Sequence, residues 1–188
     1  AATDEAGEAL GQLARAEVSV TALPCDVADG EALSRALKTI RETMPPLRGV
    51  IHAAAVMEDA LIRNLDRGQL HRVLAPKVLG ALHLDRLTRD QPLDFFVLYS
   101  SATTLLGNPG QASYVAANMA LEAVASERRA RGQPATCVLW GPIADAGYLA
   151  RNSAVREALL SRTGGEALAA DGAGGTAVKR LTHSHSGL

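Results

Sequence analysis

The sequence predicts an α/β fold in which a parallel sheet carries helices on both faces. Short, nearly all-apolar segments alternate along the chain with longer segments in which apolar residues recur at helical spacing. Strands that are apolar on both sides are typical of parallel sheets covered by helices on both faces. Four such segments are present: 18–23, 49–55, 95–99 and 135–140.

The helices are predicted from composition and from apolar spacing. The segment 67–87 is the longest, with apolar residues such as Leu70, Val73 and Leu74 on one side. A helix of small residues begins at Gln111. The remaining predicted helices span 3–15, 29–41 and 153–160.

Composition and charge exclude several classes of protein. The chain has 188 residues, 47% of them hydrophobic and 3% aromatic, so its core must be built from Ala, Leu and Val. Nineteen basic and 20 acidic residues give a net charge of −1, which provides no basic surface for nucleic acid or membrane. We see no signal peptide and no apolar stretch long enough to span a bilayer, so we expect a cytoplasmic protein. Cys25 and Cys137 lack metal-ligand spacing, and we expect buried free thiols and no metal.

The domain organisation predicted is one incomplete Rossmann-like domain over 1–162 and a Gly- and Ala-rich tail or linker over 163–188. A dinucleotide-binding domain normally opens with a strand, a Gly-rich phosphate loop and a helix. This chain opens within a predicted helix instead, so the sheet is expected to be incomplete at the N-terminus. The glycines at 107 and 110 follow a late strand and are not interpreted as that loop.

Candidate catalytic residues gather in the stretch 94–118. An apolar strand ends at Ser100 and Ser101, a small-residue turn follows, and the next helix carries Tyr114 and Asn118 four residues apart on one face. Open parallel sheets bind their ligands at the carboxyl ends of the strands. A serine and a tyrosine that converge there can hold a carbonyl oxygen and deliver a proton to it.

The chain resembles the ketoreductase domains of modular polyketide synthases and animal-type fatty acid synthases, within the short-chain dehydrogenase/reductase superfamily. Ser101 and Tyr114 are 13 residues apart, as in that superfamily. Tyr114-Val-Ala-Ala-Asn118 replaces the usual Tyr-x-x-x-Lys, and the lysine lies upstream in Val73-Leu-Ala-Pro-Lys77. Similar motifs are Cys25-Asp26-Val27, Gly49-Val-Ile-His52-Ala-Ala, Gly110-Gln111-Ala-Ser-Tyr114 and Trp140-Gly141-Pro142.

The resemblance implies NADPH-dependent reduction of a β-ketoacyl group on an acyl carrier protein to the β-hydroxyacyl form. Tyr114 would donate the proton, Ser101 would hydrogen-bond the ketone, and Lys77 would stabilise the Tyr114 phenolate and hold the cofactor ribose. Asn118 would orient Lys77 or a relay water. The expected partners are the carrier-bound substrate and other domains of the same megasynthase, including an upstream structural subdomain.

Cofactor contacts are implied at the carboxyl edge of the sheet. Asp26 is placed to accept from the adenine amino group, with Val27 against the ring, although Asp26 could instead cap the following helix. The small residues 53–55 let backbone approach the cofactor, or they serve tight packing. The full set implied is Asp26, Val27, Ala53, Ala54, Ala55, Lys77, Tyr114, Gly141 and Pro142.

Stereochemistry is implied by residues around the predicted site. Polyketide ketoreductases of the B type carry Leu-Asp-Asp where this chain has Met57-Glu58-Asp59, which keeps the last aspartate. Leu106 replaces the tryptophan of the other type, and Gln111 completes the predicted substrate set. The expectation is a B-type enzyme that forms a D-configured β-hydroxyl.

Other interpretations remain open from sequence. The protein could be a stand-alone short-chain dehydrogenase on a free substrate, or a non-catalytic structural domain of a megasynthase. Tyr114 could be a packing residue, Ser101 could bond local backbone, Lys77 could extend to solvent from a helix face, and Asn118 could lie on a helix surface. His52 is predicted to be a core histidine.

Overall fold

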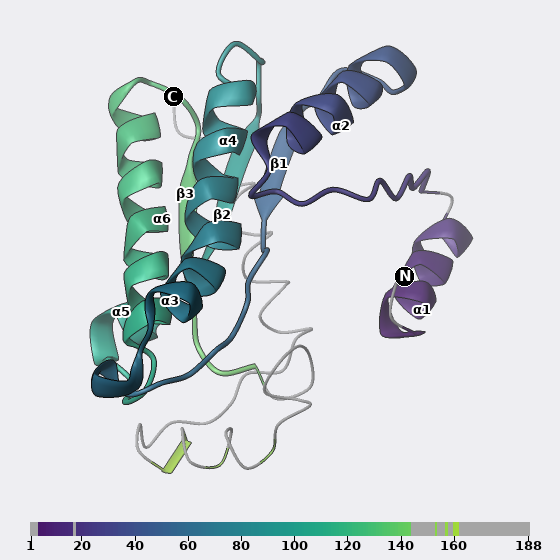
Figure 1. Ribbon diagram of the computed structural model, residues 1–188. Helices are drawn as coiled ribbons and strands as arrows, with labels where there is room; N and C mark the ends of the chain where they lie inside the picture. Colours follow the sequence, from purple (N-terminus) through teal and green to yellow (C-terminus); the bar gives the residue numbers. More distant parts are fainter. Residues whose placement is uncertain (1–3, 17, 144–152, 154–156, 158–159, 162–188) are drawn as a thin grey trace.

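The computed structural model describes residues 4–16, 18–143, 153, 157 and 160–161 (Figure 1). Its elements follow one another as α1 (Asp4–Arg15), α2 (Gly30–Thr43), β1 (Gly49–His52), the 3₁₀ turn η1 (Ile62–Asn64), α3 (Arg67–Leu74), the π-helical turn η2 (Ala75–Leu79), α4 (Gly80–Leu87), β2 (Phe95–Ser101), α5 (Thr103–Leu106), α6 (Ala112–Ala130) and β3 (Thr136–Trp140).

The strands form one parallel sheet in the order β1-β2-β3. Gly49 pairs with Phe95 and Val97 pairs with Thr136, and this register continues along each pair. The predicted Rossmann-like parallel sheet is therefore confirmed, as are three of its four strands. Because the strands are parallel, their carboxyl ends all lie at one edge of the sheet.

The predicted strand at 18–23 is wrong, because that segment forms no strand. It runs as an extended connection between α1 and α2, away from the sheet (Figure 1). Val18 and Val20 are 49% and 43% exposed, and β1, whose Ile51 is 58% exposed, pairs only with β2 among the described residues. Apolar β-branched residues favour a strand only where a neighbouring strand and a buried surface are present.

The core lies between the sheet and the helices α2, α4 and α6, which cover one face of it (Figure 1). Phe96 and Leu98 of β2 are fully buried against Leu121 and Ala125 of α6. These side chains alternate along β2, so one face of the strand supplies the core. The predicted helix at 153–160 and the predicted tail lie outside the described residues, apart from a few positions of the helix, so the helical layer on the second face stays a prediction.

The predicted helix over 67–87 is present, and a π-helical turn interrupts it. The helix begins with a capping box, in which Asp66 accepts from the Gln69 backbone and the Gln69 side chain accepts from the Asp66 backbone. Pro76 then interrupts the regular pattern, since it has no N–H to donate and its ring crowds the preceding turn. The N–H of Gly80 donates to the carbonyl of Ala75, five residues back, and this bond closes the wider turn.

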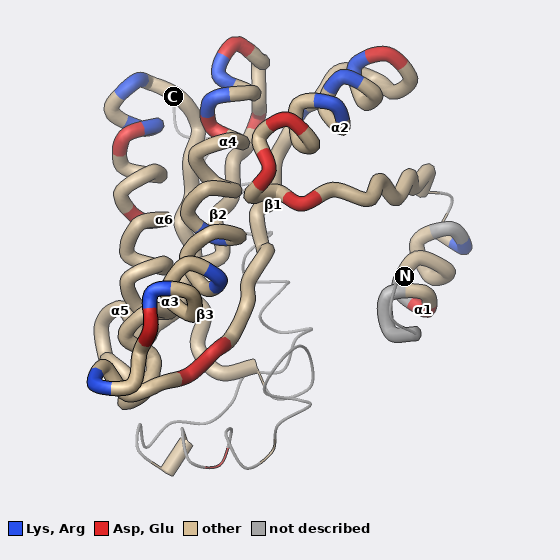
Figure 2. The backbone as a smooth tube through the Cα atoms, in the orientation of Figure 1, with Lys and Arg blue, Asp and Glu red and all other residues tan. Residues whose placement is uncertain are grey.

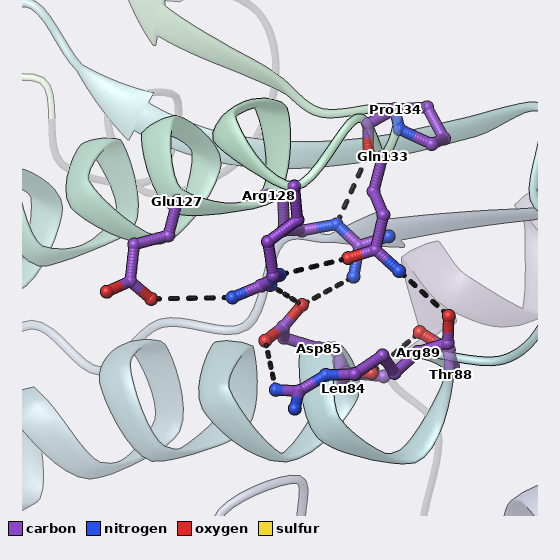
Figure 3. A network of polar contacts seen from close by, with 9 residues as sticks. Leu84, Asp85, Thr88, Arg89, Glu127, Arg128, Gln133 and Pro134 are labelled. Atoms are coloured by element: carbon purple, nitrogen blue, oxygen red, sulfur yellow. Dashed lines mark hydrogen bonds and ion pairs between the residues drawn. The ribbon is translucent and has the colours of Figure 1, made fainter.

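A buried ion network joins α4 to α6 (Figure 3). Asp85 accepts from Arg128 at 2.6 Å, from Arg131 at 2.7 Å and from Arg89 at 3.3 Å. The Arg128 side chain is 1% exposed and its guanidinium lies 3.9 Å from the centroid of the Phe96 ring. The network therefore ties both helices to the central strand.

Charge on the rest of the molecule is mixed. Basic and acidic residues are interspersed along the described helices (Figure 2). None of the described helices is long and apolar enough to cross a membrane. Cys25 and Cys137 are free thiols, as predicted, but both are only partly buried and not fully buried as expected.

Candidate active site at the carboxyl edge of the sheet

Lys77 is a buried ammonium at the centre of the candidate site. The residue is 3% exposed, and its Nζ donates to the carbonyl of Tyr99 at 2.7 Å. Burial lowers the pKa of Lys77 from its usual value to about 8. The interpretation that Lys77 extends to solvent is therefore wrong.

The same ammonium faces the ring of Tyr114. Lys77 Nζ lies 5.5 Å from the centroid of that ring, although the two residues come from different helical segments. A cation over the face of an aromatic ring is attracted by its quadrupole. The structure thus brings together the lysine of η2 and the tyrosine of α6.

Asn118 lies one helical turn after Tyr114 and is fully buried. Its Nδ2 donates to the carbonyl of Tyr114 at 2.9 Å, whereas its buried Oδ1 has no hydrogen-bond partner among the described residues. The interpretation of Asn118 as a helix-surface residue is therefore wrong. A buried amide oxygen without a partner is a ready acceptor for a water or ligand group.

Ser101 ends β2 and is 9% exposed. Its Oγ accepts from the backbone N–H of Thr103 at 3.2 Å and from the Thr103 hydroxyl at 3.0 Å. Two donors to one hydroxyl oxygen fix its position and leave its own proton free to donate. The neighbouring Ser100 points elsewhere and donates to a carboxyl oxygen of Glu122 at 3.2 Å.

Asp59 and Gln111, predicted as substrate residues, contact each other. Gln111 Nε2 donates to both carboxylate oxygens of Asp59, at 3.1 and 3.3 Å. Beside this contact, the backbone N–H of Ala60 donates to the carbonyl of Gly110 at 2.8 Å. Leu106, the third residue of that predicted set, is 68% exposed.

An open cavity of about 530 Å³ lies next to these contacts. One wall comes from the η1 region and the other from the turn before α6. Its lining residues are mostly apolar: Leu61, Ile62, Arg63, Gly107, Asn108, Pro109, Gly110, Ala112 and Val115. The cavity thus opens beside the first turn of the helix that carries Tyr114.

Apart from Lys77 and Tyr114, the predicted cofactor residues follow the ends of the strands or precede α2. Ala53, Ala54 and Ala55 come directly after β1, and Gly141 and Pro142 come directly after β3. Among the described residues, no group of acidic, histidine or cysteine side chains could hold a metal ion.

Asp26 and Val27 lie before α2. The Asp26 carboxylate accepts from the N–H of Ala28 at 2.9 Å, and the residue is exposed. The cap of α2 is Asp29, which accepts from two backbone N–H groups, so the interpretation of Asp26 as the helix cap is wrong. Asp26 is therefore left at the surface with capacity to accept further hydrogen bonds.

Two contributors to the site were not predicted. His52 is 3% exposed and donates through Nε2 to the carbonyl of Lys77 at 3.0 Å, so this core histidine also fixes the lysine backbone. A Cβ on Gly80 would lie 2.9 Å from the His52 ring, which explains the glycine there. Burial lowers the pKa of His52 and keeps the ring neutral. In the sequence, only the apolar strand around His52 indicated that this histidine is buried.

The second is the ion pair between Glu58 and Arg72. Arg72 donates twice to the Glu58 carboxylate, at 2.8 and 2.9 Å. These residues are 14 apart in the sequence, and no helical or strand spacing predicts that they meet.

The described residues form an α/β domain in which a buried lysine faces a tyrosine ring and a buried asparagine lies one helical turn after that tyrosine. A serine ends the central strand of its parallel sheet. The family model of the KR domain matches residues 1–145, and the chain belongs to this ketoreductase family. Domains of this family occur in polyketide synthases.

Individual relatives agree with this assignment. A highly reducing polyketide synthase of Penicillium decumbens, calA, is 47% identical over 136 residues, which is 72% of this chain and 5% of the relative. A structure described as an A-type ketoreductase from a modular polyketide synthase is 37% identical with a TM-score of 0.87, covering 95% of this chain and 37% of that one. The first ketoreductase of the tylosin synthase is 40% identical with a TM-score of 0.78, over 91% of this chain and 36% of that one.

The chain thus spans about a twentieth of the length of calA and little more than a third of these two solved chains.

Proposed function

We propose that this domain reduces a β-ketoacyl thioester, carried on an acyl carrier protein, to the β-hydroxyacyl form with NADPH. The observation that carries the proposal is the buried Lys77 ammonium, 5.5 Å from the centre of the Tyr114 ring. Ketone reduction requires a proton on oxygen, and a phenol beside a cation is suited to supply it.

The roles follow from the contacts. Ser101, whose oxygen already accepts from Thr103 N–H and hydroxyl, donates its proton to the ketone oxygen. Tyr114 transfers its proton to the same oxygen as negative charge develops there. Lys77, held by the Tyr99 carbonyl, stabilises the phenolate that remains. NADPH supplies the hydride when it is bound.

The residues present fit such a cofactor. Lys77 uses one hydrogen bond on protein among the described residues, so further ammonium protons remain for a ribose hydroxyl. The Oδ1 of Asn118, which has no partner in the part of the chain that the structure describes, can accept from a water that returns a proton toward Lys77. Small residues at 53–55 and at Gly141 leave the edge of the sheet open to a flat ring, and the exposed Asp26 can accept from an adenine amino group.

The finer assignments belong to the same proposal. The residue Asp59 in Met57-Glu58-Asp59 and the exposed Leu106 favour the B type and a D-configured product. The carrier and the other domains of a megasynthase, including an upstream structural subdomain, are the proposed partners. A cytoplasmic location is part of the proposal.

The test is Tyr114→Phe in the full-length protein. We expect reduction of a pantetheine-linked β-ketoester to fall by at least about 100-fold, since general acid catalysis contributes that much. NADPH affinity should stay within about threefold, because only one hydroxyl is lost. Oxidation of NADPH at 340 nm and its fluorescence titration measure the two quantities.

Tyr99→Phe is the matched control. Its ring packs 5.1 Å from Trp140, and Lys77 binds its backbone carbonyl, which the substitution leaves in place. It should retain activity. Full activity in Tyr114→Phe would remove Tyr114 from the mechanism.

A further inference from the structure

The segment between β1 and η1 is held from two sides. Glu58 receives two hydrogen bonds from Arg72 of α3, at 2.8 and 2.9 Å. Its neighbour Asp59 receives two from Gln111, at 3.1 and 3.3 Å. Adjacent side chains of one loop thus reach two different helical elements.

Those two elements carry the lysine and the tyrosine of the site. Arg72 lies five residues before Lys77 on the continuous helix α3–η2. Gln111 is the residue before α6, three positions from Tyr114, and is 5% exposed. The loop therefore bridges the ammonium-bearing and phenol-bearing elements at the mouth of the site.

The pair Glu58–Arg72 has a fixed geometry. Bidentate contacts between a guanidinium and a carboxylate define orientation as well as distance. A Cβ on Gly68 would lie 3.2 Å from the guanidinium, so the arginine also packs over the first turn of α3. The hydrogen bonds from Arg72 hold the pKa of Glu58 below its usual range, so the pair stays charged.

The pair contributes little to stability. The Arg72 and Glu58 side chains are 56% and 29% exposed, and exposed ion pairs have small net effects because water and salt screen them. A contact with exact direction and little net stabilisation is suited to positioning a loop.

We propose that Arg72 and Glu58 form a strut that fixes Asp59 beside Gln111 and thereby determines which face of the ketone is presented for reduction. Arg72 is in this view a positioning residue that controls product configuration from outside the reacting atoms. The inference rests on the proposed ketone reduction.

The experiment measures the ratio of the two β-hydroxyl configurations by chiral chromatography. The full-length protein reduces a pantetheine-linked β-ketoester with NADPH. Glu58→Gln and Arg72→Gln should each lower the ratio by about two- to fivefold, the size expected for an exposed pair. The double variant Glu58→Arg with Arg72→Glu should recover at least half of the loss, because it restores the pair with reversed charges.

A second measurement uses salt. Raising ionic strength from about 0.05 to 1 M shortens the screening length from about 14 to 3 Å. The wild-type ratio should fall as salt rises, and the ratio of Arg72→Gln should not respond. Arg67→Gln, an exposed arginine near the start of α3, is the matched control and should behave as wild type.

Two outcomes would contradict the proposal that Arg72 and Glu58 position Asp59. Single variants with an unchanged ratio would do so, as would a charge-reversed pair no better than the single variants. Melting temperatures measured alongside should stay within about 2 °C of wild type, because the pair is exposed. If the wild type reduces no ketone at all, the proposed function fails instead, and the two failures are thus distinguishable.

Discussion

Lys77 combines a proposed role in the reaction with a cost to the stability of the fold. Its ammonium is buried, and its hydrogen bond among the described residues is to one backbone carbonyl. The fall of its pKa from 10.5 to about 8 means that the folded state binds this proton less tightly than the unfolded chain does. The charged form therefore destabilises the fold at neutral pH, by about 3 kcal/mol before compensation.

We expect Lys77→Met to abolish reduction while raising the free energy of unfolding at pH 7 by about 1–2 kcal/mol. This gain in the free energy of unfolding is smaller than the cost of about 3 kcal/mol for burying the charge, because the Tyr99 carbonyl loses its hydrogen-bond donor. Between pH 8 and 10.5 the wild-type lysine loses its proton in the folded state first, so wild-type stability should rise relative to the variant. Urea unfolding at pH 7 and pH 10 measures the difference in the free energy of unfolding between the wild type and the variant. A difference that stays constant with pH would contradict this account.

At the scale of elements, the network around Asp85 fastens α4 to α6. Burial alone would raise the pKa of this carboxyl, but hydrogen bonds and charge from Arg128, Arg131 and Arg89 outweigh it and lower the pKa. The stabilisation is therefore present above the usual carboxyl range and is lost as pH falls through the lowered pKa. The guanidinium of Arg128 cannot lose its proton to escape burial.

Asp85→Asn should lower the free energy of unfolding by about 3 kcal/mol, since it leaves the buried Arg128 without its countercharge. The loss should shrink in acid, where the wild-type carboxyl is itself protonated. Chemical unfolding monitored by circular dichroism between pH 3 and 7 measures both effects.

Glu31→Gln provides the comparison for this network. It breaks an exposed i,i+4 pair, in which Glu31 is 92% exposed, and should be nearly neutral. If Asp85→Asn and Glu31→Gln changed the free energy of unfolding equally, burial of the network would make no difference to its contribution to stability.

Sequence predicted those elements whose signal is local. The strands β1, β2 and β3 and the helix over 67–87 were found because each carries its own apolar pattern. Ser101, Tyr114 and Asn118 became candidates because they share one stretch, and Lys77 became one because the resemblance pointed to it. The segment 18–23 failed because a strand also needs a neighbour, which no local pattern supplies.

Contacts between distant charged residues could not be predicted in the same way. Arg128 reads as one of several arginines at a helix end, yet it is buried against Phe96 and Asp85. Glu58 and Arg72 each look like ordinary surface residues. Which charged side chains meet depends on how the helices are placed in space, and spacing along the chain does not encode that.

At the scale of the whole molecule, the described residues form a three-stranded sheet with its helical layer on one face (Figure 1). The proposed cofactor residues lie at its carboxyl edge or before α2. Among the described residues, no strand is followed by a glycine-rich phosphate loop of the dinucleotide-binding kind. Such a loop binds the pyrophosphate at a helix N-terminus, which contributes much of the affinity.

Residues 1–188 alone should therefore bind NADPH weakly, with a dissociation constant of about 1 mM or higher, which is a binding free energy of about −4 kcal/mol or a less negative value. Titration of cofactor fluorescence on the purified chain measures this. Micromolar binding by the chain alone would mean that the residues present already hold the pyrophosphate.

The π-helical turn at Ala75–Leu79 accommodates one extra residue between α3 and α4 without changing the helical phase of either segment. One added residue in a regular helix would turn every later side chain by about 100°, and this turn absorbs that offset within five residues. Loss of one residue there would return the segment to a regular α-helix and leave Asp85 in line with Arg128, while the local turn that directs Lys77 toward the Tyr114 ring would be lost. The wider turn thus affects the placement of Lys77 and spares the packing of α4 on α6, so a one-residue deletion at this point would be felt at the proposed site alone.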